Sequence, residues 1–151
     1  MVTDIVRVAT TVLGGLVLVG AVSDAAQERY PVFTDVHLTR TMKTLGPNVA
    51  AARASMRSRD YEAAKAQLVR AREQLATTVT FWRDRDDDDA VALLRDALNS
   101  LDGLDDALSA VEVEASDVAR RAAALGGACQ ACHTAYREQD PVTGAYRVKS
   151  Q

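Results

Sequence analysis

The sequence predicts an all-α fold, a four-helix bundle of up-down-up-down topology. Four segments carry apolar residues at alternating spacings of four and three, which places these residues along one face of a helix. Aromatic residues make up only 5% of the 151-residue chain, and glycine and proline are sparse, at 8 and 3 residues. Apolar seams of this kind favour packing at shallow crossing angles, the geometry of a four-helix bundle. The length suits one domain with a real core.

Each predicted helix is defined by its own apolar seam. The first seam continues in phase past Pro47, which predicts a bend in that helix and not its end. In chain order the four seams are Leu38, Met42, Leu45, Val49, Ala52 and Met56; Tyr61, Ala64, Leu68, Ala71, Leu75, Thr78 and Trp82; Leu94, Ala97, Leu101, Leu104, Leu108 and Val111; and Val118, Ala122, Leu125, Cys129, Cys132 and Tyr136.

Polar segments separate these helices. Ser58-Arg59-Asp60 divides the first two, and Ser58 or Asp60 can cap the second. Residues 83–89 divide the second from the third and end in a run of aspartates, which we interpret as a solvated loop whose last carboxylates face a helix N-terminus. The run lacks the central glycine and the spaced ligands of an EF-hand calcium loop. The third break is expected at residues 112–116, and residues 144–151 are expected to form a frayed polar tail.

The N-terminal segment predicts export. Residues 8–22 carry no charge, but a membrane span needs about 20 apolar residues, so the run suits the core of a signal peptide better. Ser23-Asp24-Ala25 is a usable cleavage site. We therefore expect residues 1–25 to be a signal peptide, with an uncleaved membrane anchor at residues 5–22 as the alternative. In either case residues 26–151 would form the four-helix domain, in the periplasm or another extracytoplasmic compartment.

Charge and cysteine usage exclude several classes of protein. The formal net charge is −3, whereas a nucleic-acid binder would normally show a basic patch. The chain has two cysteines, Cys129 and Cys132, which lie too close together to staple distant loops as in a disulfide scaffold. Two cysteines at this spacing are more typical of chemistry or of cofactor attachment.

Cys129-Gln-Ala-Cys-His133 is the attachment motif for c-type haem. On a helix, positions i, i+3 and i+4 share a face, so both thiols can form thioethers with one haem while His133 directs a nitrogen at the iron. A thioredoxin-like dithiol would need a βαβ context, which the pattern lacks. A zinc site would need about four ligands, and outside the motif the chain offers only His37 and carboxylates. We therefore expect one covalent haem c per chain.

A haem motif at the C-terminal end of a four-helix chain resembles the cytochrome c′ family, the class II c-type cytochromes. The resemblance covers about residues 33 to 138 and is most specific in Cys129-Gln-Ala-Cys-His-Thr-Ala-Tyr-Arg137. It extends to Arg40-Thr-Met-Lys-Thr-Leu-Gly-Pro-Asn48 and to Tyr61-Glu-Ala-Ala. In one branch of this family the iron is five-coordinate, and in the other a methionine of the first helix completes a low-spin site. Met42 falls where that methionine would lie, so the chain resembles the low-spin branch, with Leu45 as a departure of unknown effect.

Further site residues follow from helical geometry. Arg137, four residues after His133, is expected on the same helical face, near the proximal side of the haem or paired with a propionate. His37 is not expected to bind the iron, because five residues of helix turn it about 140° away from Met42. Gly126 and Gly127 either let the helix backbone approach the haem edge or mark a local bend.

The function implied is one-electron transfer between extracytoplasmic redox partner proteins, with His133 and Met42 as the iron ligands. The alternative is a five-coordinate haem protein that binds small gases such as NO and CO. A third reading is a haem-stabilised structural subunit, and a homodimer would fit the alanines of the first helix, Ala50, Ala51 and Ala54. No pattern of nucleophile and base suggests an enzyme.

Overall fold

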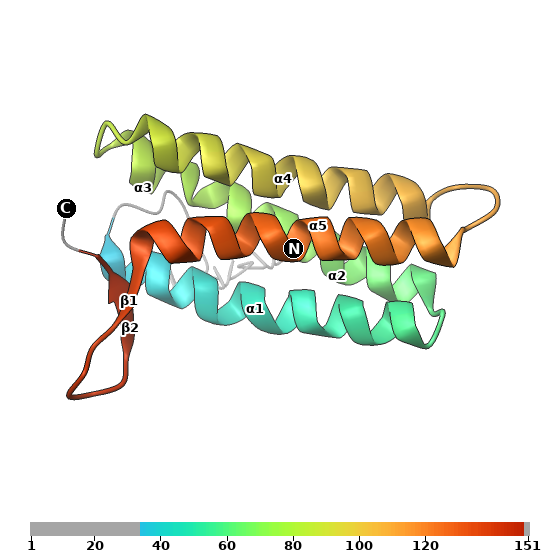
Figure 1. Ribbon diagram of the computed structural model, residues 1–151, viewed down its shortest axis with the longest axis horizontal. Coiled ribbons are helices and arrows are strands. Elements are labelled where there is room, and N and C mark those ends of the chain that lie inside the picture. Colours follow the sequence, from blue (N-terminus) through green and yellow to red (C-terminus); the bar gives the residue numbers. More distant parts are fainter. Residues whose placement is uncertain (1–33, 150–151) are drawn as a thin grey trace, which may run out of the picture.

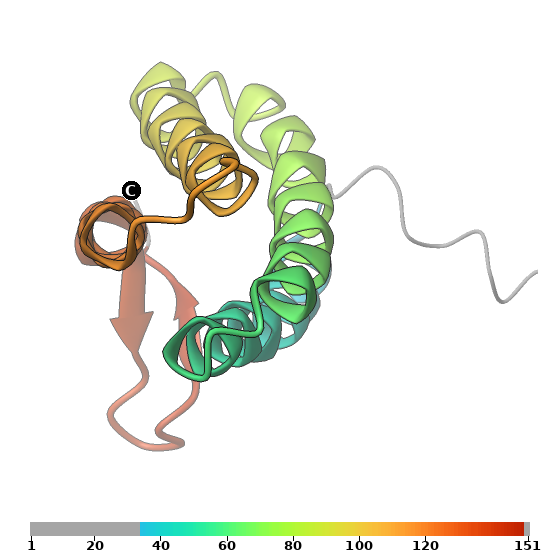
Figure 2. The same cartoon turned by 90° about the vertical axis from the view of Figure 1, so that its right-hand side faces the viewer.

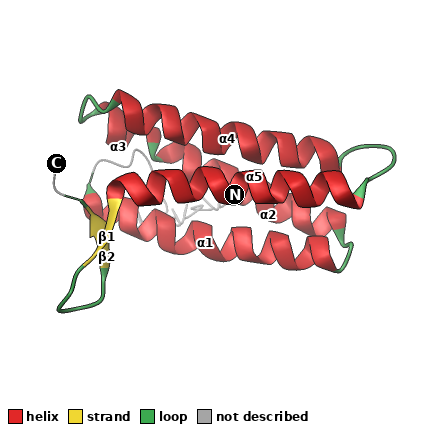
Figure 3. Cartoon of the chain, viewed as in Figure 1, coloured by secondary structure: helices red, strands yellow, loops and turns green. Residues whose placement is uncertain are grey.

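The computed structural model describes residues 34–149, and most of these residues are helical (Figure 1; Figure 3). The all-α prediction is confirmed for the body of the fold, but it omitted a two-stranded sheet near the C-terminus. The predicted signal peptide or anchor lies outside the described residues. Within residues 34–149, no helix has the length and apolar character to cross a membrane. The elements are α1 (Asp35–Arg57), α2 (Tyr61–Thr77), α3 (Val79–Arg83), α4 (Asp88–Leu108), α5 (Ala115–Tyr136), β1 (Arg137–Gln139) and β2 (Tyr146–Val148).

Aspartate side chains cap α2 and α4 at the two breaks that the sequence indicates. The break at residues 58–60 is confirmed, and Asp60 is the residue that caps α2: its carboxylate accepts a hydrogen bond from the backbone N–H of Ala63 at 3.0 Å. Asp87 caps α4 in the same way, accepting from the N–H of Ala90 at 2.8 Å. The interpretation of the aspartate run as a loop that ends against a helix N-terminus is therefore confirmed. Pro47 lies inside α1, which continues past it as predicted.

The second predicted helix is interrupted at Thr78, which ends α2 and precedes the short helix α3. The hydroxyl groups of Thr77 and Thr78 donate to the carbonyls of Gln74 and Leu75, each at 2.7 Å. Threonine hydroxyls compete with the helical backbone in this way, and a run of β-branched residues is a weak helix former. The seam nevertheless stays in phase, because Phe81 and Trp82 of α3 are buried.

The seam predicted for the third helix is one residue too long. α4 ends at Leu108, and Val111 is fully exposed in the following loop. The true break therefore runs from Ser109 to Glu114, earlier than the predicted 112–116. Ser109 closes the helix as its C-cap, and its N–H donates to the carbonyls of Asp105 and Asp106.

The four long helices pack in chain order, α1 on α2, α2 on α4 and α4 on α5. Seen along their axes they form an arc whose two ends are α1 and α5 (Figure 2). α1 and α5 do not pack closely on each other, because the short loop at residues 58–60 folds α2 back along α1, and α5 packs on α4. The core lines the inside of the arc; its largest fully buried side chains are Phe81, Leu101, Leu104, Leu125 and Thr78.

The residues expected to form a frayed tail instead complete a β-hairpin. β1 and β2 pair antiparallel, with Arg137 opposite Val148 and Gln139 opposite Tyr146. In the turn, the Asp140 carboxylate accepts hydrogen bonds from the N–H groups of Val142 and Thr143, which lower the pKa of that carboxyl. Gly144 follows with φ 69°, a left-handed conformation that glycine adopts without strain. The prediction of a frayed tail is therefore wrong for residues 144–149.

Candidate functional site

The residues of the predicted haem motif lie together on the last two turns of α5. The helix runs without interruption from Ala115 to Tyr136, so Cys129, Cys132 and His133 keep the i, i+3, i+4 spacing that aligns side chains on one face. All three side chains are half-buried, and both cysteines are free thiols packed against the hydrophobic core. The structure therefore brings the three residues together on a regular helical surface.

Burial sets the protonation of these groups. It raises the pKa of the Cys129 thiol, an effect that Arg53 opposes in part, and it raises the pKa of the Cys132 thiol together with the nearby charges of Cys129 and Asp87. Burial also lowers the pKa of His133, and the positive charge of Arg137 adds to this effect. Neutral thiols and a neutral imidazole are thus favoured, and a neutral imidazole has the lone pair that a metal ligand needs.

The last turn of α5 is supported from inside the bundle. The Tyr136 hydroxyl donates a hydrogen bond to Oδ1 of Asp87 at 2.8 Å, and its ring lies 4.8 Å, centroid to centroid, from that of Trp82. Trp82 in turn packs edge-on against Phe81 at 4.8 Å. The apolar pattern of the sequence places Tyr136 and Trp82 on seams, but it predicts no supporting role for them or for Asp87. Only the fold brings Asp87, in its loop, beside the end of α5.

Met42 lies on α1, in the half of that helix that runs alongside the C-terminal half of α5 (Figure 1). Its side chain is half-buried and packs against the core between the buried residues Leu38 and Leu45. The predicted seam position of Met42 is therefore confirmed, and its role as an iron ligand stays a prediction. His37 lies in the first turn of α1, where its backbone N–H donates to the cap residue Thr34.

Arg137 does not continue the helix as expected. It is the C-cap of α5 and the first residue of β1, with the extended angles φ −111° and ψ 131°, because pairing with β2 starts there. Its exposed guanidinium lies over the ring of Tyr146, 4.5 Å from the centroid. The helical position assumed for Arg137 is thus wrong, and contact with a haem propionate stays a prediction.

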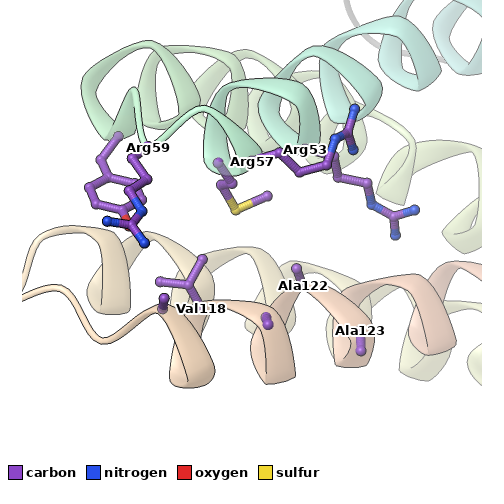
Figure 4. Close-up of a pocket in the computed structure, with 10 residues that line it drawn as sticks. Arg53, Arg57, Arg59, Val118, Ala122 and Ala123 are labelled. Atoms are coloured by element: carbon purple, nitrogen blue, oxygen red, sulfur yellow. The ribbon is translucent and has the colours of Figure 1, made fainter.

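An open pocket of about 440 Å³ lies between α1 and the N-terminal half of α5, on the open side of the arc. Arginines from the end of α1 and the turn after it form one wall, and small apolar residues of α5 form the other. Figure 4 labels Arg53, Arg57, Arg59, Val118, Ala122 and Ala123.

Gly126 faces α1 at the edge of this pocket. A Cβ added at Gly126 would lie 2.8 Å from Nη2 of Arg53, so the glycine leaves room for an α1 side chain. Apart from its chain neighbours and the backbone of its own helix, a Cβ at Gly127 would have no heavy atom within 4 Å. α5 continues as one helix through both glycines.

Gly127→Ala is expected to stabilise the fold by about 0.5–1 kcal/mol, because alanine loses less backbone entropy than glycine in a helix and the new methyl group meets open space. The measurement is the midpoint of unfolding in urea, monitored by circular dichroism. Gly126→Ala is the matched control and should gain less, since its methyl group must displace the Arg53 guanidinium. A lower midpoint for Gly127→Ala would contradict the expectation that the new methyl group meets open space.

Comparison of the chain with protein-family models, with curated proteins and with solved structures found no match. The resemblance to the cytochrome c′ family therefore depends on the residues quoted for it.

Proposed function

We propose that this chain is an extracytoplasmic c-type cytochrome that transfers single electrons between redox partner proteins, built as an up-down-up-down four-helix bundle. Cys129 and Cys132 would hold one haem through thioether bonds, and His133 and Met42 would bind its iron. The observation that carries the proposal is the Cys-x-x-Cys-His motif on one face of a continuous helix, with both thiols free and half-buried.

The residues around the motif fit such a group. The motif face borders the side of the bundle where α1 and α5 do not pack closely. Among the described residues, the cysteine sulfurs take part in no disulfide that would compete with thioether formation.

A haem held at this place would supply an iron that cycles between two oxidation states. The chain's own residues set how that iron behaves. His133 is held on a helix end that is anchored by Tyr136 and Asp87, and a thioether from Met42 is a soft ligand suited to haem iron opposite histidine. If His133 and Met42 both bound the iron, Met42 would exclude small gases and favour electron transfer.

The open α1–α5 side supports a second candidate, a five-coordinate haem protein that binds NO or CO. If α1 stands too far from α5 for Met42 to reach the iron, that face of the haem stays accessible to a gas. A homodimer through α1 is also a proposal, because Ala50 and Ala54 are exposed on that helix. Ala51, the third alanine of this group, is half-buried.

Optical spectra of the purified protein in both redox states, with and without carbon monoxide, test the proposal. We expect low-spin spectra in both states and little change of the ferrous spectrum on adding carbon monoxide. A high-spin ferrous spectrum that shifts fully with carbon monoxide would favour the gas-binding function. A protein without haem absorption, made in a host that attaches haem, would exclude both.

A further inference from the structure

The C-terminal hairpin follows directly after the predicted haem motif and holds the end of α5. The backbone N–H of Lys149, just after β2, donates to the carbonyl of Tyr136 at 2.9 Å. Its ammonium group donates to the carbonyl of Thr134 at 2.6 Å. Two carbonyls of the last turn of α5, which a helix end leaves without intrahelical partners, are thereby satisfied from one residue.

The hairpin also contacts α1. β2 packs against α1, and Val148 is half-buried against the hydrophobic core. In the end-on view, the strands run from the end of α5 towards α1, across the open side of the arc (Figure 2). Because α1 and α5 do not pack closely on each other, the hairpin is a direct link between them at the end of the bundle that carries His133.

Ion pairs within the hairpin connect its two strands and its turn. Arg147 pairs with Glu138 across the strands at 2.7 Å and with Asp140 in the turn at 3.4 Å. On the opposite side, Tyr136 joins the end of α5 to Asp87 and Trp82. The last turn of α5 is therefore held from two directions, by the bundle interior and by the hairpin, and the hairpin alone among these contacts extends to α1.

We propose that the hairpin of residues 137–149 is a positioning strap that holds α1 at the distance from His133 at which Met42 reaches the haem iron. The strap rests on the proposed function, since it acts on the bond between Met42 and iron. Val148 and Lys149 are its positioning residues: Val148 attaches β2 to the core, and Lys149 attaches the hairpin to α5.

Val148→Asp tests the strap in the full-length holoprotein, because a carboxylate at a half-buried position should lift β2 from the core. Val142→Asp is the matched control: it makes the same substitution in the same hairpin, at a side chain that is 91% exposed. We expect Val148→Asp to keep its covalent haem, to gain high-spin character and to bind carbon monoxide about tenfold more tightly, since more of the protein has an open iron. Val142→Asp should match the wild type.

A Val148→Asp protein with the low-spin spectrum and carbon monoxide affinity of the wild type would overturn the strap. If Val148→Asp does not fold, Lys149→Met takes its place: it removes the bond to the Thr134 carbonyl and keeps the apolar core intact, with the same expected and contrary results. Mass spectrometry separates the two proposals. A wild-type chain without haem refutes the proposed function, whereas a low-spin holoprotein that is insensitive to the substitution tested refutes only the strap. A wild type that is already high-spin refutes it too, since no methionine bond then exists to position.

Discussion

Replacing both Cys129 and Cys132 with serine is expected to abolish covalent haem attachment. Each thiol would form one thioether, and a serine hydroxyl lacks the nucleophilic sulfur that this bond requires. Because the chain contains no other cysteine, no second residue can take over. The measurement is haem staining of the denatured protein on a gel, where only covalently bound haem stays with the polypeptide.

Ala131→Ser is the control for the cysteine variants. It introduces the same side chain between the two cysteines, at an exposed position of α5, and should leave attachment unchanged. Each single cysteine variant should retain one thioether and a weaker stain. Full staining of the double variant would mean that the cysteines do not carry the haem.

Met42→Ala is expected to convert a low-spin haem protein into a high-spin one that binds carbon monoxide in the ferrous state. Alanine cannot ligate iron, so the sixth position would become open while His133 and both thioethers remain. The measurement is the ferric and ferrous absorption spectrum, followed by titration with carbon monoxide. The half-buried methionine also packs against the core, so some loss of stability will accompany the change.

Met56→Ala separates ligation from packing. Met56 is also half-buried against the core on α1, but it lies fourteen residues further along, about 21 Å at the helical rise. Its removal should therefore reduce stability to a similar extent and leave the spectrum low-spin. If both variants keep the low-spin spectrum, Met42 is a core residue and another group fills the sixth position.

The parts of the fold that depend on local sequence could be predicted. The alternating seams identified the four long helices. The polar residues at 58–60 and the aspartate run that ends residues 83–89 marked two helix starts, because capping and periodicity act within a few residues. The shared face of Cys129, Cys132 and His133 is local in the same sense, since it needs only an unbroken helix.

What could not be predicted depends on contacts between distant segments. β1 and β2 are three residues each and mostly polar, so they lack the alternation of apolar and polar residues that predicts a strand. The support of Tyr136 by Asp87 joins residues 49 positions apart. The loose packing of α1 against α5 likewise follows from how all the helices pack, which the apolar seams alone do not determine.

Denaturing mass spectrometry of the wild-type chain, produced in a host that attaches c-type haem, tests the central claim most directly. The polypeptide should carry the added mass of one haem, and digestion should place that mass on the peptide containing Cys129 and Cys132. A mass equal to the bare polypeptide would contradict the assignment of this chain as a c-type cytochrome.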